Sequence, residues 1–341
     1  MIRTTPDAPT SGTGIVPARP AAASAHPLLI VKGSAVHSVL RSLLVLLVAA
    51  SLVPAADLGP GERAGDRRVI GIKGQEVALR WCPPGSFTMG SPPKEPERKR
   101  DEGEHRVVLT EGFWLMETEV TQALQAAVGQ VGRPKFKGAN RPADRVTWYD
   151  AVELANLLST ATGLTPAYAI DKTTPDPATT TEAKLDDKRW TVTRVADATG
   201  FRLPTEAQWE YACRAGTTTI FSCGDAIDST KANFNGRSAY NRAPESPWAE
   251  QTLPVGSFPP NPWGFLDIHG NVWEWCWDRY GEYPVAEATD PEGAASGPDR
   301  VMRGGTWEYK GAYLRSAARI HYSAAKYWDL IGVRLAVPPT R

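Results

Sequence analysis

The pattern of apolar and polar positions predicts short strands at the start of the folded part of the chain. Between residues 68 and 87, brief apolar runs are separated by turns, and a Pro-Pro-Gly segment at 83–85 interrupts them, as is typical of strands. Further strands are expected at 107–109 and 113–117. The charged segment 94–105 that precedes them is expected to be a solvated loop.

Helical spacing of apolar residues appears next. A helix is predicted within 118–128, with Thr121 as its N-cap. The signal is stronger after Thr147, the expected N-cap of a helix whose apolar stripe covers 151–158.

A third helix is predicted after Thr205. Gln208 stands three residues later, which is the spacing of a capping box. The helical pattern then continues over 207–215, and Gly216 is expected to end it.

The rest of the chain has little regular pattern. The polar segment 173–187 is expected to be an exposed insertion beside a strand at 189–194. After residue 216 only short strands such as 301–303 and 332–336 are expected. A loop-rich domain needs other means of stabilisation, and the 12 tryptophans can supply it, because each buries a large ring while its indole N–H bonds a carbonyl.

Charge excludes one class of partner. The 38 basic residues balance the 38 acidic residues, so the chain lacks the positive field that holds a nucleic-acid backbone. Nucleic acid is therefore not expected as a partner.

The N-terminal region differs in composition from the rest. An apolar run at 43–53 follows Lys32 and Arg41 and precedes small residues around Ala55 and Ala56, which is the pattern of a secretory signal. We expect residues 1–56 to form a disordered extension plus a signal peptide or an uncleaved N-terminal membrane anchor. The folded part is then exported, to a periplasmic, cell-surface or secreted location.

Four cysteines are available in such a compartment: Cys82, Cys213, Cys223 and Cys276. Their pairing is left open, since four cysteines allow three full pairings. Cys213 and Cys223 are close in the sequence and could bridge, or Cys213 could be a buried free thiol. No spacing typical of a zinc ribbon or a thioredoxin-like site occurs.

Several sequence blocks now identify a family resemblance. In chain order they lie at 87–91, 117–121, 142–148, 201–212, 261–275, 303–307 and 332–336. The block Phe-Arg-Leu-Pro-Thr-Glu-Ala-Gln-Trp-Glu-Tyr-Ala at 201–212 is the most specific. Together the blocks resemble the formylglycine-generating enzyme, or sulfatase-modifying factor, family over residues 68–338.

The resemblance implies the fold. We expect one complex α+β domain with little regular secondary structure, related to the C-type-lectin-like fold and usually containing calcium. It implies calcium ligands from the side chains of Asn271 and Glu274 and the carbonyls of Gly270 and Val272, a mixture of oxygens that suits this ion. The alternative is a capped turn around Trp273.

The chemistry of the family's oxidases does not carry over. The resemblance implies that those members hold copper(I) with two cysteine thiolates just after the Gly-Gly segment. Here Tyr309 stands at the first cysteine position and the second has no counterpart. A phenol with an ordinary pKa of about 10 is a poor ligand for a soft metal, so copper is not expected and no catalytic residue is assigned.

The other candidate residues are interpreted as scaffold. Ser316 and Leu335 stand where some oxidases have cysteines, so the resemblance leaves Cys213 without its usual partner. Cys276 is expected to be a small buried apolar residue, and His269 a hydrogen-bonding residue rather than a ligand.

Two classes of function remain. The first is a noncatalytic recognition or scaffold module for a protein, peptide or glycan, with a ligand surface formed by Trp263, Trp307, Tyr309 and Arg319. The second is an oxidase that converts a sulfatase cysteine to formylglycine through a non-standard site. The absent cysteine pair favours the first.

Overall fold

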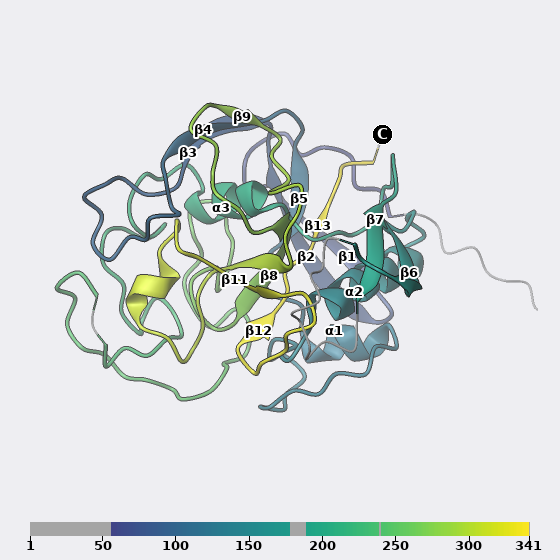
Figure 1. Cartoon of the computed structure of the whole chain (residues 1–341). Coiled ribbons are helices and arrows are strands. Elements are labelled where there is room, and N and C mark those ends of the chain that lie inside the picture. The colour runs from purple at the N-terminus through teal and green to yellow at the C-terminus, as the bar shows by residue number, and fades with distance from the viewer. Residues whose placement is uncertain (1–55, 178–188, 239, 341) are drawn as a thin grey trace, which may run out of the picture. The chain divides into compact units, whose positions relative to one another are not determined.

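Two four-stranded sheets carry the fold (Figure 1). The computed structural model describes residues 56–177, 189–238 and 240–340. The expected extension and signal segment therefore lies outside the described residues, except for Ala56. Within the described ranges, no helix combines the length and the apolar character that crossing a membrane requires.

The first sheet has the strand order β1-β2-β5-β13. Its strands are β1 (Arg67–Ile72), β2 (Gln75–Cys82), β5 (Phe113–Met116) and β13 (Ala336–Val337). The second sheet has the order β11-β10-β8-β12. Its strands are β11 (Arg319–Ser323), β10 (Asp299–Arg303), β8 (Trp273–Arg279) and β12 (Ile331–Gly332).

Two smaller sheets complete the strands. One contains β3 (Gly85–Met89), β4 (His105–Leu109) and β9 (Ala288–Thr289). The other is the hairpin of β6 (Tyr168–Pro175) and β7 (Trp190–Arg194). With three helices among these strands, the described residues confirm an α+β class.

All three predicted helices form. They are α1 (Gln122–Ala127), α2 (Trp148–Ala161) and α3 (Glu206–Arg214). Thr121, Thr147 and Thr205 are the N-caps, and the predicted capping box of Thr205 with Gln208 is confirmed. Helix α3 packs between β3 and the strands β8 and β10 (Figure 1).

Tryptophans tie separate segments together, as the sequence predicts. The indole N–H of Trp114 donates to Leu58 O at 3.2 Å, that of Trp148 to Cys276 O at 3.0 Å, and that of Trp275 to Val146 O at 2.8 Å. Each ring is buried and each donor is satisfied.

Three expectations about strands need correction. Strand β8 was not predicted, although its tryptophans at 273, 275 and 277 recur at the two-residue spacing of a strand. Five of its seven residues are buried, so the strand lies in the core on both faces. Residues 333–335 link β12 to β13 instead of continuing one strand. Residues 173–175 belong to β6, while 178–188 of the expected insertion lie outside the described residues.

Candidate functional site

The segment that follows β10 holds the position of the family's first cysteine. Gly304 and Gly305 have φ angles of 99° and 84°, so the chain turns sharply there, and a Cβ on Gly305 would lie 2.6 Å from a Leu314 side-chain atom. The chain then runs through Tyr309 into a 3-10 helix, η1 (Gly311–Leu314). Glycine is therefore required at residue 305 on both conformational and steric grounds.

The Tyr309 ring is half-buried among other aromatic rings. Its centroid lies 5.0 Å from that of Tyr313 and 6.2 Å from that of Trp273. Burial, and then the neighbouring Tyr322, raises the pKa of the Tyr309 phenol. The side chain is thus a neutral hydrogen-bonding group and a ring surface, not an anionic ligand.

A cleft of about 660 Å³ opens beside Tyr309. Its lining residues, which define the tyrosine cleft, are Lys99, Arg100, Asp101, Tyr280, Tyr309, Tyr313, Arg319, Ile320, His321 and Tyr322. None of the chain's four cysteines is among them. The chemistry available in the tyrosine cleft is that of phenols, one imidazole and cationic side chains.

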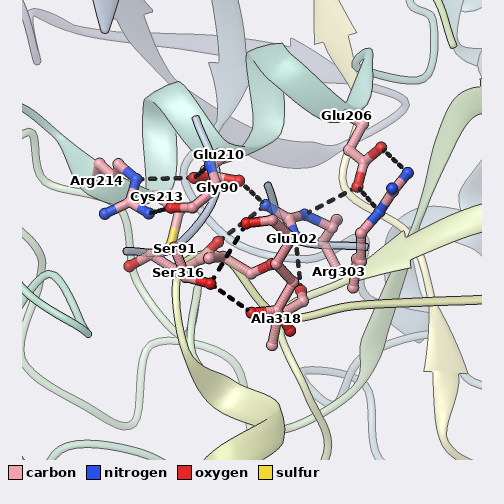
Figure 2. A network of polar contacts seen from close by, with 12 residues as sticks. Gly90, Ser91, Glu102, Glu206, Glu210, Cys213, Arg214, Arg303, Ser316 and Ala318 are labelled. Atoms are coloured by element: carbon pink, nitrogen blue, oxygen red, sulfur yellow. Dashed lines mark hydrogen bonds and ion pairs between the residues drawn. The ribbon is translucent and has the colours of Figure 1, made fainter. Parts of the chain in front are cut away.

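A network of buried charges lies beneath this segment (Figure 2). Arg303 is fully buried and pairs with Glu210, while its Nε lies 3.7 Å from Glu206 Oε1. The terminal nitrogens of Arg303, Nη1 and Nη2, also donate to the carbonyls of Ser316, Ala317 and Ala318 at 2.7–2.9 Å. The guanidinium therefore fixes the end of the segment that carries Tyr309.

Two further arginines extend this network. Arg315 makes a bidentate pair with Glu102, with both contacts at 2.7 Å, and Arg319 pairs bidentately with Glu206 at 2.9 and 2.6 Å. Bidentate geometry of this kind fixes both orientation and distance. Because Glu102 is buried, the expectation that 94–105 is wholly solvated is wrong for its C-terminal end.

Arg319 lines the tyrosine cleft, but its positive charge is already paired with a carboxylate. Besides its pair with Glu206, it donates to Asp101 O and Gly281 O and lies 4.0 Å from the Tyr283 ring centroid. Burial alone would lower the pKa of the Arg319 guanidinium, but the charge of Glu206 holds that pKa above its ordinary value. Its role here is to shape the floor of the cleft.

Two of the four predicted surface residues lie elsewhere. Trp307 is buried, with 4% exposure, because its ring packs between Phe136 and Trp248. Trp263 packs edge-on against Tyr211 at 4.9 Å. Of the predicted surface, only Tyr309 and Arg319 share the cleft.

The predicted calcium ligands are mostly engaged with protein groups. Glu274 accepts from Arg334 at 2.8 Å and from the Trp209 indole at 2.6 Å. Asn271 Oδ1 accepts from Asn233 Nδ2 and Leu253 N at 3.0 and 2.9 Å. These two side chains do not fit the ligand role that the resemblance implies for them.

Two neighbouring carboxylates fit that role better. Asp267 Oδ1 and Glu119 Oε2 are buried without a hydrogen-bond partner. Burial, reinforced by nearby acidic groups, raises the pKa of Asp267 to about 6 and that of Glu119 well above its ordinary value. Within the described ranges no three His, Cys, Asp or Glu side chains form a metal cage, so an ion here would rely on carbonyl oxygens as well.

The cysteines are free thiols in the structure, and three of them are buried. Burial raises the pKa of Cys213 to about 12 and that of Cys276 well above its ordinary value. His269 Nδ1 donates to Leu314 O and His269 Nε2 accepts from the Ser222 hydroxyl, both at 2.8 Å, and burial lowers the pKa of His269 to about 4. The scaffold interpretation of Cys276 and His269 agrees with this burial.

Sequence reasoning missed most residues of the tyrosine cleft. Lys99 and Arg100 lie in the loop before β4, and His321 and Tyr322 lie in β11, more than 200 residues later. No periodic pattern links two such segments. The density of tyrosines between 280 and 322 was the available signal.

Comparisons with known proteins agree with the fold and the sequence blocks. Residues 73–338 match the family described as sulfatase-modifying factor enzyme 1-like domain. A similar protein is the chaperone protein LppX of Paenibacillus barcinonensis, 35% identical over 209 residues, which cover 59% of this chain and 71% of LppX. The formylglycine-generating enzyme of Mus musculus is 36% identical over 146 residues, 40% of this chain and 39% of that enzyme.

A solved structure shows the same architecture. The Treponema denticola variable protein 1 superposes with a TM-score of 0.66 and 26% identity, covering 80% of this chain and 99% of that one. The similarity therefore extends over nearly the whole of that solved chain.

Proposed function

Because this chain belongs to the sulfatase-modifying factor enzyme 1-like family, we propose that it is an exported, noncatalytic recognition module that binds a polypeptide in the tyrosine cleft. The observation that carries the proposal is the composition of that cleft. Phenols and cations line the place where the family's oxidases require thiolates. Such a surface binds and orients a ligand but offers no soft metal site.

The form of the cleft supports binding as well. Its volume of about 660 Å³ falls in the range of roughly 300–1,000 Å³ that ligand pockets occupy. Tyrosine supplies contact area and a polar hydroxyl at a low entropic cost, which suits a recognition surface. The buried network around Arg303 holds the Tyr309 segment in place, so binding costs little conformational entropy in this segment.

A polypeptide is favoured over a glycan by the comparisons. LppX, which is named a chaperone protein, is matched by this chain over 71% of the length of LppX. The formylglycine-generating enzyme is the contrasting relative, but this chain covers only 39% of it, and the thiolates of the implied copper site are absent here.

We also propose that the protein binds calcium as a structural ion. Asp267 and Glu119 would hold it with their unpartnered oxygens, because a cation offsets the cost of two buried carboxylates. Its effect would be to stabilise the fold and not to react with a ligand.

The test is a binding assay with the full chain on a cellulose-bound array of 12-residue peptides of systematically varied composition. We expect the wild type to bind a subset of peptides and Tyr309→Ala to lose them. The matched control is Tyr327→Ala, since Tyr327 is 60% exposed and lies outside the cleft. Equal binding by wild type and Tyr309→Ala, or no binding to any peptide, would contradict the proposal.

A further inference from the structure

Strand β11 has an open edge. It is the first strand of the sheet β11-β10-β8-β12 and pairs only with β10. In an antiparallel edge strand, alternate residues turn their N–H and C=O groups away from the partner strand. Among the described residues, no other segment hydrogen-bonds to the main chain of Ile320, His321 or Tyr322.

The tyrosine cleft runs along this open edge. Successive residues of a strand face opposite sides of the sheet, yet Ile320, His321 and Tyr322 all line the one cleft. On one side the His321 ring stacks on Tyr280 with centroids 3.7 Å apart. On the other, Tyr322 lines the cleft together with Tyr309. A cleft that contacts both sides of a strand must pass along its edge.

The charge around the cleft is positive. Lys99 and Arg100 are exposed and form no ion pair with another described residue. The Lys99 ammonium lies 5.1 Å from the Tyr313 ring centroid. Two of the acidic groups nearby are engaged, whereas Glu308, next to Tyr309, is exposed and lies outside the cleft lining. Asp101 accepts from the Tyr280 hydroxyl at 2.8 Å, and Asp299 contacts His321 Nδ1 at 2.6 Å.

A third cation lies at the far end of β11. Lys326 lies 4.1 Å from the Trp328 ring centroid and 5.8 Å from that of Tyr322. Lys310, by comparison, is paired with Glu97. Unpaired cations therefore flank the open strand at both ends.

We propose that the polypeptide ligand is an extended acidic segment that adds to β11 as a fifth strand. This inference rests on the proposed function, since it names the ligand of the same cleft. Five residues of β11 give roughly 17 Å of pairing, and main-chain hydrogen bonds supply affinity while side-chain contacts select sequence. Lys99, Arg100 and Lys326 select acidic side chains, and the tyrosine rings cover the added strand.

The test uses the full chain and a fluorescein-labelled peptide with five repeats of Glu-Thr, followed by fluorescence anisotropy. The comparison peptides are five repeats of Lys-Thr and the Glu-Thr peptide with N-methyl groups on alternate residues, which removes main-chain donors. We expect saturable binding of the Glu-Thr peptide only, and weakening by added salt because the charges are exposed.

Variants separate charge from folding. The double variant K99E/R100E should weaken binding by at least about 10-fold, while R133E/K137E, which reverses two exposed cations outside the cleft, should leave it within about 2-fold. Equal binding of the N-methylated peptide would overturn strand addition. Equal binding by K99E/R100E and wild type would overturn the acidic ligand.

The two proposals fail in different ways. If the Glu-Thr peptide does not bind while array peptides still bind in a Tyr309-dependent manner, the acidic added strand is wrong and the recognition module stands. If neither binds, both are wrong. Displacement of the Glu-Thr peptide by an acidic oligosaccharide, but by no peptide, would also overturn strand addition.

Discussion

The buried network around Arg303 and the tyrosine cleft above it use the same segments in opposite ways. In the network, Arg303, Arg315 and Arg319 each contact a glutamate carboxylate, and all three are at most 2% exposed. In the cleft, Lys99 and Arg100 are exposed and form no ion pair within the described part of the chain. The difference separates two tasks: paired charges fix the shape of the segment, and unpaired charges are left for a partner.

The largest effect should come from breaking the network. Arg303→Ala removes one of the two guanidinium groups that contact the buried Glu210 carboxylate, since Arg214 still pairs with it. Removing one partner of a buried ion pair typically costs about 3–5 kcal/mol of unfolding free energy. Urea unfolding measures it. The matched control is Arg106→Ala, since the Arg106 side chain is 62% exposed in its ion pair and should change stability by less than about 0.5 kcal/mol. Similar losses for the two variants would contradict the assigned role of the network.

The second effect depends on pH. Asp278 accepts from the Glu206 main-chain N–H at 2.7 Å, and burial, followed by the charge of Glu206, raises its pKa from 3.8 to about 7. The folded state then binds this proton more tightly than the unfolded state does. The stabilisation is fully present below about pH 4 and is lost as pH rises through 7.

Asp278→Asn isolates that contribution, because the amide oxygen can still accept from Glu206. Between pH 4 and pH 7 the wild type should lose roughly 2–4 kcal/mol relative to the variant. Urea unfolding at four pH values measures the difference. A difference that does not change with pH would contradict the raised pKa.

The architecture was predictable where local chemistry decides it. Thr147 and Thr205 predicted the starts of α2 and α3 because a capping box depends only on residues three positions apart. Strand β8 was missed although its three tryptophans alternate with other residues along the sequence. Its identity depends on β10 and β12, which are far away in the sequence.

The site was predictable only in part for a related reason. The position of Tyr309 follows from the sequence block at 303–307, and in the structure Tyr309 and Arg319 line the same cleft. Trp307 looked equally suitable, but a large aromatic residue serves a core as well as a surface, and only packing distinguishes the two. Asp267 and Glu119 come together from separate segments, so their unpartnered oxygens leave no sequence signal.

A third effect tests the cleft without disturbing the network. Tyr309→Phe keeps the ring and removes the hydroxyl, so the free energy of unfolding should change by less than about 1 kcal/mol. Binding of array peptides should weaken by about 3- to 10-fold if the phenol donates to a ligand. Affinity is measured by titration, and a loss of stability larger than the loss of binding energy would place Tyr309 in the scaffold instead.

The smallest effect concerns the proposed ion. Added calcium should raise the melting temperature of the wild type by a few degrees, since binding to the folded state alone stabilises it by mass action. Asp267→Asn should abolish that rise, whereas Asp290→Asn, an exposed aspartate far from Glu119 in the sequence, should retain it. An equal rise in both variants would exclude Asp267 as a ligand.

The central claim is that a cleft of phenols and cations recognises a polypeptide and does not oxidise it. Mass spectrometry of a sulfatase-derived cysteine peptide after incubation with the full chain, oxygen and copper(I) tests this most directly, beside an active formylglycine-generating enzyme as control. We predict that the cysteine stays unchanged with this chain while the control forms the aldehyde. Aldehyde formed by this chain, and lost in Tyr309→Phe, would contradict the claim and make the tyrosine cleft an active site.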